Sequence, residues 1–346
     1  MLYTTPRSKS NIETAYKASH QDCAADGGLF TPFRMVQFSK EEILALKDHS
    51  FGQNMADVLN HFFGCSLSGW DIEFAIGRSP VKFQTITHRI LIAESWHNSQ
   101  WKLDHVVQLL SDRIRGDDAG CLPSNWMTIA VRIALLFAIY GQLVATEQIA
   151  DCAELDVAVT AGDFASPMAA WYARQMGLPV GNIICGCNAN GGVWDLLHHG
   201  TLSTGGISVK TLTPEADVVV PRNLERLVYE SLGMEENLNY LDRCRAGSVY
   251  TLAEEPFELL RKGMFAAVIS DTRIRSIIHS VFRTSNYVFG PYTALAYGSL
   301  LDYRAKTGES RAALLLSERS PICDSEVVAQ AMQIPVSELF KRINIS

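Results

Sequence analysis

A turn that could bind an anion follows a short apolar run near the middle of the chain. The run Val157–Thr160 has the composition of a buried strand, and the pattern after it predicts a helix over Pro167–Met176. Between them lies the turn Ala161-Gly162-Asp163-Phe164-Ala165-Ser166. A helix N-terminus presents free backbone N–H groups and the positive end of its dipole, so this turn could hold a phosphate or a carboxylate. Gly162 would let the backbone come close to such a ligand.

Two observations leave this interpretation open. Many loops between a strand and a helix have a similar composition, so a plain structural turn remains the alternative. Asp163 also counts against an anion, because its own negative charge lies in the turn. That objection would not hold if the side chain pointed away or capped the helix.

The cysteines and histidines do not have the spacing of a metal site. None of the eight cysteines forms a CxxC pair. Cys185 and Cys187 are two residues apart, which places both side chains on one face of a strand. His198 and His199 are adjacent, so their rings would diverge on a helix. We therefore expect reduced thiols in a cytoplasmic protein, and no metal.

The order of apolar runs and glycine turns predicts an α/β fold with a parallel sheet, because strand, turn, helix and strand follow one another. Strands are expected over Ile72–Phe74, Val81–Phe83, Arg89–Ala93, Val157–Thr160, Val180–Gly186 and Ala312–Leu316. Helices are expected over Glu41–Asp48 behind a capping box at Ser39, and over Asp104–Arg115, Trp126–Val144, Pro167–Met176, Asn223–Leu232, Phe257–Lys262 and Pro291–Thr307, with Ser325–Met332 as the terminal helix.

Bulk properties restrict the class of protein. A chain of 346 residues with 47% hydrophobic residues can bury a large core. The net charge of -7 argues against nucleic acid or an anionic membrane as the main partner. The N-terminus has no apolar signal-peptide region. Arg132 and Gln142 interrupt the longest apolar stretch, so a buried helix is expected there rather than a membrane span.

Several motifs, in the same order over most of the chain, resemble the threonine synthase family. The turn at Gly162 is similar to the family's V-P-S/T-G-N-F-G loop, and Met176-Gly177-Leu178-Pro179 is similar to its M-G-L-P. Further similar segments are Asp26-Gly27-Gly28-Leu29-Phe30 (D-G-G-L-Y), Cys187-Asn188-Ala189-Asn190 (T-N-x-N), Asn223-Leu224-Glu225-Arg226-Leu227 (N-F-E-R-L), Gly290-Pro291-Tyr292-Thr293-Ala294 (D-P-H-T-A) and Leu316-Ser317-Glu318 (L-S-T). The resemblance implies the fold of pyridoxal phosphate (PLP) enzymes of fold-type II. It also implies a lyase that acts on a phosphate ester, O-phospho-homoserine.

The resemblance also shows where this chain departs from the family. The family's Schiff-base lysine lies in E-L-F-H-G-P-T-L-A-F-K-D, and the matching segment here ends in Trp101-Lys102-Leu103-Asp104. Leu103 falls at the lysine position, and leucine has no amine to form an imine. Lys102 is one residue away, where a helix would turn its side chain by about 100°. Rescue by Lys102 is the alternative left open.

A second departure concerns the small subdomain that covers the cofactor in the family. Only 19 residues separate Asp104 from Ser124, and the family's S-G-D-T-G loop is absent from them. We therefore divide the chain into an N-terminal segment (1–95), a shortened remnant of that subdomain (96–123) and a large α/β domain (124–346).

Other candidate cofactor contacts are altered or retained. In the phosphate loop, the family's Asn is Asp163 and its second Gly is Ala165, whose β-carbon would crowd a phosphate. Phe164 and Asn188 match the family, and so does Ser317, in a region that supplies a hydroxyl to the pyridine nitrogen. Glu318 replaces the Thr beside it, which fits either a pairing with a protonated pyridinium or a lost function.

Three functions follow from these departures. The first is a binding or regulatory pseudoenzyme without PLP imine catalysis, which would act with a protein partner or as a homo-oligomer. The second is a repurposed enzyme acting on a phosphorylated amino acid without PLP, with the Gly162 turn as its anion cradle. The third is a PLP lyase of the threonine synthase type that uses Lys102.

Overall fold

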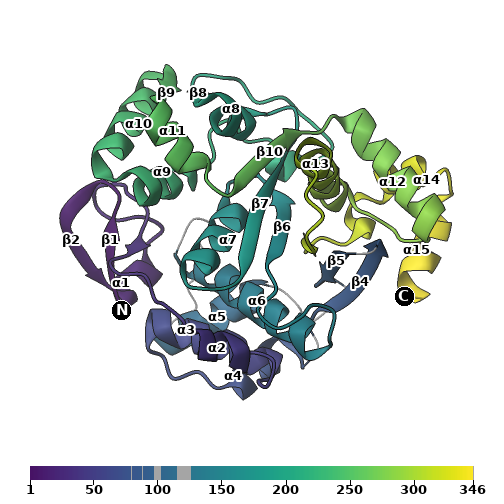
Figure 1. Ribbon diagram of the computed structural model, residues 1–346, viewed down its shortest axis with the longest axis horizontal. Coiled ribbons are helices and arrows are strands. Elements are labelled where there is room, and N and C mark those ends of the chain that lie inside the picture. Colours follow the sequence, from purple (N-terminus) through teal and green to yellow (C-terminus); the bar gives the residue numbers. More distant parts are fainter. Residues whose placement is uncertain (79, 88, 97–102, 115–125, 346) are drawn as a thin grey trace.

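A six-stranded sheet lies at the centre of the computed structural model, which describes residues 1–78, 80–87, 89–96, 103–114 and 126–345 (Figure 1). The strand order is β10-β7-β6-β11-β5-β4. The strands are β4 (Lys82–Thr87), β5 (Ile90–Glu94), β6 (Leu155–Thr160), β7 (Val180–Cys187), β10 (Met264–Val268) and β11 (Ala313–Ser317). Neighbours are parallel except for the edge strand β4, which is antiparallel to β5. The predicted α/β fold with a mostly parallel sheet is confirmed.

Helices cover both faces of this sheet because its strands are apolar on both sides. Val157 and Val159 of β6 face one hydrophobic core, and Ala158 between them faces the other. The first core is built with α3 (Phe51–Phe63), α5 (Leu103–Ile114), α6 (Trp126–Ala145), α7 (Ala165–Gln175) and α8 (Gly192–His199). The second is built with α12 (Asp271–Ser285), α13 (Pro291–Thr307), α14 (Ser325–Met332) and α15 (Val336–Ile345).

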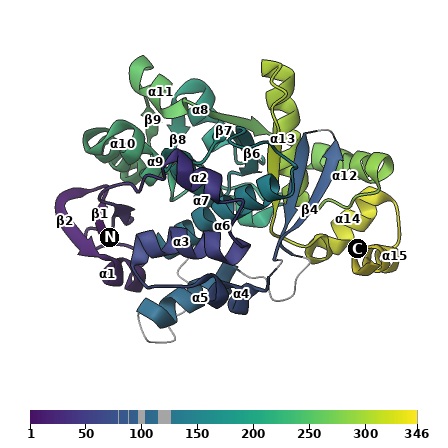
Figure 2. The ribbon, with the colours of Figure 1, turned by 60° about the horizontal axis from the view of Figure 1, so that its bottom comes forward.

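The apolar helix α6 is a core helix. Its length and composition would suffice to cross a membrane, but 83% of its most apolar window is buried inside the protein. It packs against α3, α5 and α7, and Figure 2 shows α3 and α6 side by side. This agrees with the buried helix that the sequence predicts over Trp126–Val144.

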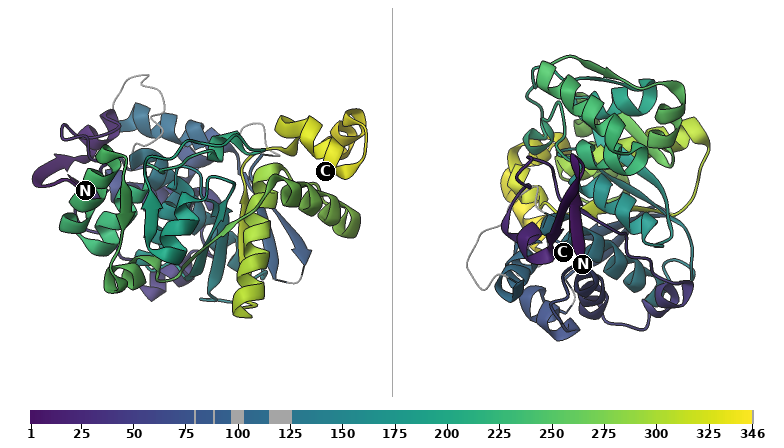
Figure 3. Two further views of the ribbon diagram at one scale, coloured as in Figure 1. Left: turned by 90° about the horizontal axis from the view of Figure 1, so that it is seen from above. Right: turned by 90° about the vertical axis from the view of Figure 1, so that its left-hand side faces the viewer.

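An N-terminal α+β segment, residues 1–76, lies at one side of the molecule, in the purple part of the ribbon (Figure 3). The predicted boundary at residue 95 is wrong, because β4 and β5 belong to the central sheet. Its three-stranded sheet has the order β2-β1-β3. The segment comprises β1 (Leu2–Thr5), β2 (Ser8–Thr14), α1 (Ala15–His20), β3 (Thr31–Pro32), α2 (Lys40–Ala45) and, after α3, α4 (Gly69–Ile76). The capping box predicted at Ser39 is confirmed, with the Ser39 hydroxyl accepting from the Glu42 backbone N–H.

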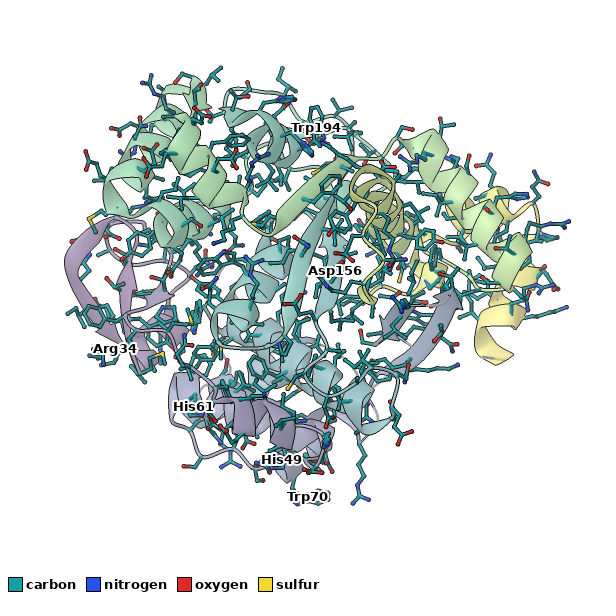
Figure 4. All side chains as sticks on the ribbon, in the orientation of Figure 1. Arg34, His49, His61, Trp70, Asp156 and Trp194 are labelled. Atoms are coloured by element: carbon teal, nitrogen blue, oxygen red, sulfur yellow. The ribbon has the colours of Figure 1, made fainter. Side chains whose placement is uncertain are left out.

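The strand predicted over Ile72–Phe74 is wrong, because this segment belongs to helix α4. A second capping box, in which Ser68 and Asp71 exchange side-chain and backbone hydrogen bonds, starts the helix. The helix buries Ile72 and leaves Trp70 and Phe74 exposed, and Figure 4 shows Trp70 at the outer edge of the molecule. Those exposed aromatic residues, alternating with acids, imitate the period of a strand.

Elements that the sequence analysis did not predict complete the fold. Helix α15 follows α14, so Ser325–Met332 is not the terminal helix. A small antiparallel sheet and the helices beside it lie on the far side of β10. The unpredicted elements there are β8 (Thr201–Ser203), β9 (Val249–Thr251) and α10 (Met234–Ala246). Beside them lie α9 (Leu224–Leu232) and α11 (Glu254–Arg261), which confirm the helices predicted over Asn223–Leu232 and Phe257–Lys262. Short 3-10 turns lie at Pro214–Ala216 and, packed against α14, at Pro321–Asp324.

A buried arginine fastens the N-terminal segment to the large domain. The Arg226 side chain is fully buried, and its Nε and Nη2 donate to the Phe30 carbonyl at 3.0 and 2.9 Å. Its Nη1 donates to Asn223 Oδ1, and its guanidinium lies 5.8 Å from the centre of the Trp126 ring. Arginine remains charged in a protein interior, so each of these partners compensates a desolvated cation.

We expect Arg226→Met to lower the free energy of unfolding by about 3–5 kcal/mol, because it leaves the Phe30 carbonyl and Asn223 without their buried donor. Urea denaturation measures this loss. Arg222→Met is the matched control: Arg222 pairs with Asp22 at the surface, where such pairs contribute about 0–1 kcal/mol. Equal losses in the two variants would contradict the role given to Arg226.

We expect Glu230 to make the stability of the protein depend on pH. Burial raises the pKa of Glu230 from 4.5 to about 7, and the Tyr172 hydroxyl donates to its carboxylate at 2.9 Å. A raised pKa means that the folded state binds the proton more tightly, so this contribution to stability is complete below pH 4.5 and is lost as the pH rises through about 7.

We therefore compare the free energies of unfolding of Glu230→Gln and the unchanged protein. As the pH rises from below 4.5 to above 7, we expect the difference to shift by about 3 kcal/mol in favour of Glu230→Gln. Glutamine still accepts the Tyr172 hydroxyl but has no proton to release. Urea denaturation at several pH values measures the difference, and a difference that is constant with pH would exclude Glu230 as the titrating group.

Candidate functional site

A cavity of about 640 Å³ opens at the C-terminal ends of β6 and β11. Its walls include Val159–Asp163, at the end of β6 and in the turn after it, and Leu316 with Glu318–Ser320, at the end of β11 and just beyond it. These two strands are neighbours in the sheet, while β6 connects through α7 to β7 on its other side. Ligands of open α/β sheets bind at such a point, where successive connections leave in opposite directions.

The charged groups of the cavity are largely paired with one another. The lining contains the carboxylates of Asp104, Asp163, Glu215 and Glu318 and the guanidinium groups of Arg132 and Arg319. Arg132 Nη1 donates to both oxygens of Glu318 at 2.8 and 2.9 Å, and Arg319 Nη1 donates to Glu215 at 2.7 Å. Because both arginines are engaged and carboxylates outnumber them, the cavity is acidic.

The turn before α7 is closed by its own aspartate. The Ala165 backbone N–H donates to Asp163 Oδ1 at 3.0 Å, and the Phe164 N–H donates to the Ala161 carbonyl at 2.7 Å. Phe164 has a φ of 68°, an uncommon conformation for a residue with a β-carbon. Gly162 has a φ of 45°, and the space where a β-carbon would stand is open. Asp163 therefore occupies a helix N–H group that an anion would need.

The side chain of Asn223 holds Asp163 in place through its backbone carbonyl and its carboxylate. Asn223 Nδ2 donates to the Asp163 carbonyl at 3.1 Å and lies 3.4 Å from the carboxylate Oδ2. The opposite end of the same amide accepts from Arg226. Asn223 thus links the turn to the buried Arg226 contact that fastens the N-terminal segment.

Ser317 is engaged by two neighbours at the end of β11. The Trp96 indole N–H donates to Ser317 Oγ at 3.2 Å, and the Thr293 hydroxyl lies 3.0 Å from the same oxygen. Ser317 is buried, whereas Trp96 and Thr293 line the cavity. A ligand in the cavity would therefore meet the indole and the Thr293 hydroxyl near this serine.

Of the other candidate residues predicted from the sequence, some line the cavity, some are buried beside it and one lies outside the described residues. Gly162 and Asp163 line the cavity, and Phe164 and Ala165 are buried beside them. Lys102 lies outside the described residues, and Leu103 is the first residue of α5.

Asn188 belongs to another cluster, which fastens a loop to the end of β7. Its side-chain nitrogen donates to the hydroxyls of Thr211 and Thr213 and to the Asp217 carboxylate at 2.8–3.0 Å. Its oxygen accepts from the Asn190 backbone N–H at 2.9 Å. In the part of the chain that the structure describes, these contacts use the Asn188 amide to hold protein rather than to face the cavity at β6 and β11.

Sequence reasoning missed Trp96, Arg132 and Thr293 as parts of the site. One signal was available, because Arg132 is the single charged residue in an otherwise apolar helix. A charge in that position must reach either a partner or a cavity. Trp96 and Thr293 carry no such charge, although Thr293 lies in the segment Gly290–Ala294 that resembles a family motif.

Comparisons with known proteins relate the chain to threonine synthases. No family model matches it. It is 26% identical over 175 residues, 50% of this chain, to human threonine synthase-like 1, of which the match covers 24%. It is 26% identical over 230 residues, 63% of this chain, to threonine synthase of Pseudomonas aeruginosa, of which the match covers 47%. These matches therefore span less than half of the length of each relative.

Solved structures show the same fold. The structure of PLP-bound threonine synthase from Brucella melitensis aligns with a TM-score of 0.86, covering 99% of this chain and 94% of that chain at 17% identity. The predicted resemblance to the fold of that family is confirmed.

We expect Asp163→Ala to lower the free energy of unfolding by about 1 kcal/mol, because α7 loses a side chain that accepts from the Ala165 N–H at its start. Inorganic phosphate should restore part of this loss, since the vacated N–H groups can bind it. Urea denaturation with phosphate or chloride at equal ionic strength separates this effect from screening. Equal stabilisation of the unchanged protein by phosphate would contradict the view that Asp163 fills the position.

Proposed function

Because this chain is related to the threonine synthases in sequence and shares their fold, we propose that it is a binding or regulatory protein of that lineage that does not use PLP imine catalysis. The contact between Asp163 and the Ala165 N–H carries this proposal. The expected protein partner or homo-oligomer, and the expected cytoplasmic location, stay predictions.

The phosphate end of PLP does not fit the turn as it stands. A phosphate at the start of α7 would need the N–H group that Asp163 already occupies at 3.0 Å. Two unit charges of the same sign 4 Å apart repel by about 4 kcal/mol at an effective dielectric constant of 20. Asn223 opposes a movement of Asp163, because it holds both the carbonyl and the side chain of this residue.

The two residues expected near the pyridine ring of PLP, Ser317 and Glu318, also have partners within the protein. Ser317, which by resemblance would meet the pyridine nitrogen, accepts the Trp96 indole N–H, and its own O–H is free for that nitrogen only where it does not donate to the Thr293 hydroxyl 3.0 Å away. Glu318 is held by Arg132 through both carboxylate oxygens, so it is not available as a partner for a pyridinium. By resemblance, Leu103 stands where the family has its lysine. These contacts and this substitution support a loss of PLP binding.

The remaining cavity supports a binding role for a different ligand. Its volume of about 640 Å³ is ordinary for a small-molecule site. Its surplus of carboxylates favours a neutral polar or cationic group over a phosphate. The alternative function, a lyase acting on a phosphorylated amino acid, requires an anion at the same turn, so the Asp163 contact counts against it too.

A visible absorbance titration with PLP, followed by borohydride reduction and peptide mass mapping, tests the proposal. We expect no saturable aldimine band, and only scattered labelling of surface lysines that is equal in the unchanged protein and in Lys102→Arg. A saturable band, with PLP trapped on Lys102 and lost in Lys102→Arg, would overturn the proposal and restore a lyase of the threonine synthase type.

Leu103→Lys separates the two parts of the argument. This variant returns an amine to the family's lysine position but leaves Asp163 at the start of α7. We expect it, too, to form no saturable aldimine. A band in Leu103→Lys alone would mean that the turn accepts the phosphate and that the argument from Asp163 is wrong.

A further inference from the structure

A second cavity, of about 590 Å³, lies between the β4–β5 edge of the sheet and the C-terminal helix α15. The loop after α12, at Asn286–Val288, forms another wall. In Figure 1 and Figure 2 the strands β4 and β5 stand beside the yellow C-terminal helices. Trp96 lines both this cavity and the one at β6 and β11, so the two spaces adjoin at this residue.

The inner wall of this second cavity carries a buried carboxylate. Glu94, at the end of β5, is 3% exposed, and burial raises the pKa of its side chain. Among the described residues its hydrogen-bond donor is the Tyr287 hydroxyl. A carboxylate has about four acceptor sites, so Glu94 can accept further donors from a ligand in the cavity.

Positive charge lies beside this carboxylate and on the helix wall of the cavity. Lys82 is the direct partner of Glu94 in the antiparallel β4–β5 register, which places both side chains on one face of the sheet. Lys341 is exposed on α15. Arg342 is held in place by Glu338 at 3.0 Å and by Asn286 at 3.2 Å, over the ring of Phe282. The cavity thus has Glu94 and Lys82 on its sheet wall, and Lys341 and the Arg342–Glu338 pair on its helix wall.

We propose that this cavity binds a small zwitterion, an α-amino acid or a close analogue, with its ammonium group on Glu94 and its carboxylate toward Lys341. An anion alone would meet the Glu94 carboxylate, and a cation alone would meet Lys82, Lys341 and Arg342. A ligand with both charges can pair its ammonium group with Glu94 and its carboxylate with Lys341. Val288 and Trp96 offer apolar surface to its side chain. The inference does not depend on the function proposed for the first cavity.

The test is scanning fluorimetry of the full chain with each standard L-amino acid at millimolar concentration, followed by calorimetric titration of those that stabilise it. We expect at least one to bind. We expect Glu94→Gln to weaken binding by about tenfold or more, because it keeps the acceptor for Tyr287 but removes the charge. Lys341→Ala should weaken it by about threefold to tenfold, and Lys262→Ala, an exposed lysine outside this cavity, should leave it unchanged.

Two analogues of each amino acid that binds, one without the amino group and one without the carboxylate, test the two charges. Both should bind more weakly than the parent. No binding by any amino acid, unchanged binding in Lys341→Glu, or an analogue without the amino group that binds as tightly as the parent would each overturn the inference. Lys341 is exposed, so Lys341→Glu keeps the test decisive even if Glu94→Gln fails to fold. A PLP aldimine would overturn the proposed function and leave this result unaffected.

Discussion

The buried guanidinium of Arg226 is the constraint on which the geometry of the site depends. One side of this group holds the Phe30 carbonyl of the N-terminal segment, and the other holds the side-chain oxygen of Asn223. The nitrogen of the same Asn223 amide reaches Asp163. A charge that must be fully compensated in the interior therefore fixes an amide, and the amide fixes the turn before α7. The N-terminal segment and the cavity are parts of one hydrogen-bonded structure.

This chain of contacts explains why the turn keeps its shape although the charge within it has changed. Phe164 remains in a left-handed conformation because its own N–H donates to the Ala161 carbonyl and because the carbonyl of Asp163, the residue before it, accepts from Asn223. The helix N-terminus still receives a negative group, but the group belongs to the protein. The positive end of the α7 dipole is thereby neutralised without a ligand.

How much the sequence predicted depended on whether a signal was local. The strands β6, β7 and β11 and the helices α6 and α13 follow from apolar runs bounded by turn residues, and the motifs of a known family supplied their arrangement. Helix α4 was mistaken for a strand because exposed aromatic side chains on it alternate with acids. The possibility that Asp163 caps its helix was visible in the sequence, but its tie to Asn223, 60 residues away, was not. The contact between Trp96 and Ser317, 221 residues apart, carries no sequence signal at all.

The residues that hold this fold and the residues that would do chemistry in it are different, and this difference allows the function to change. Arg226 and the two cores use buried groups whose loss would destabilise the whole domain. The cavity at β6 and β11 is altered by single side chains at its surface: Asp163 at the helix, Glu318 beside Arg132, and Trp96 against Ser317. Under the proposed function, each of these contacts inside the protein stands where a ligand would otherwise bind. A fold retained in this way keeps its cavities while the ligands that suit them change.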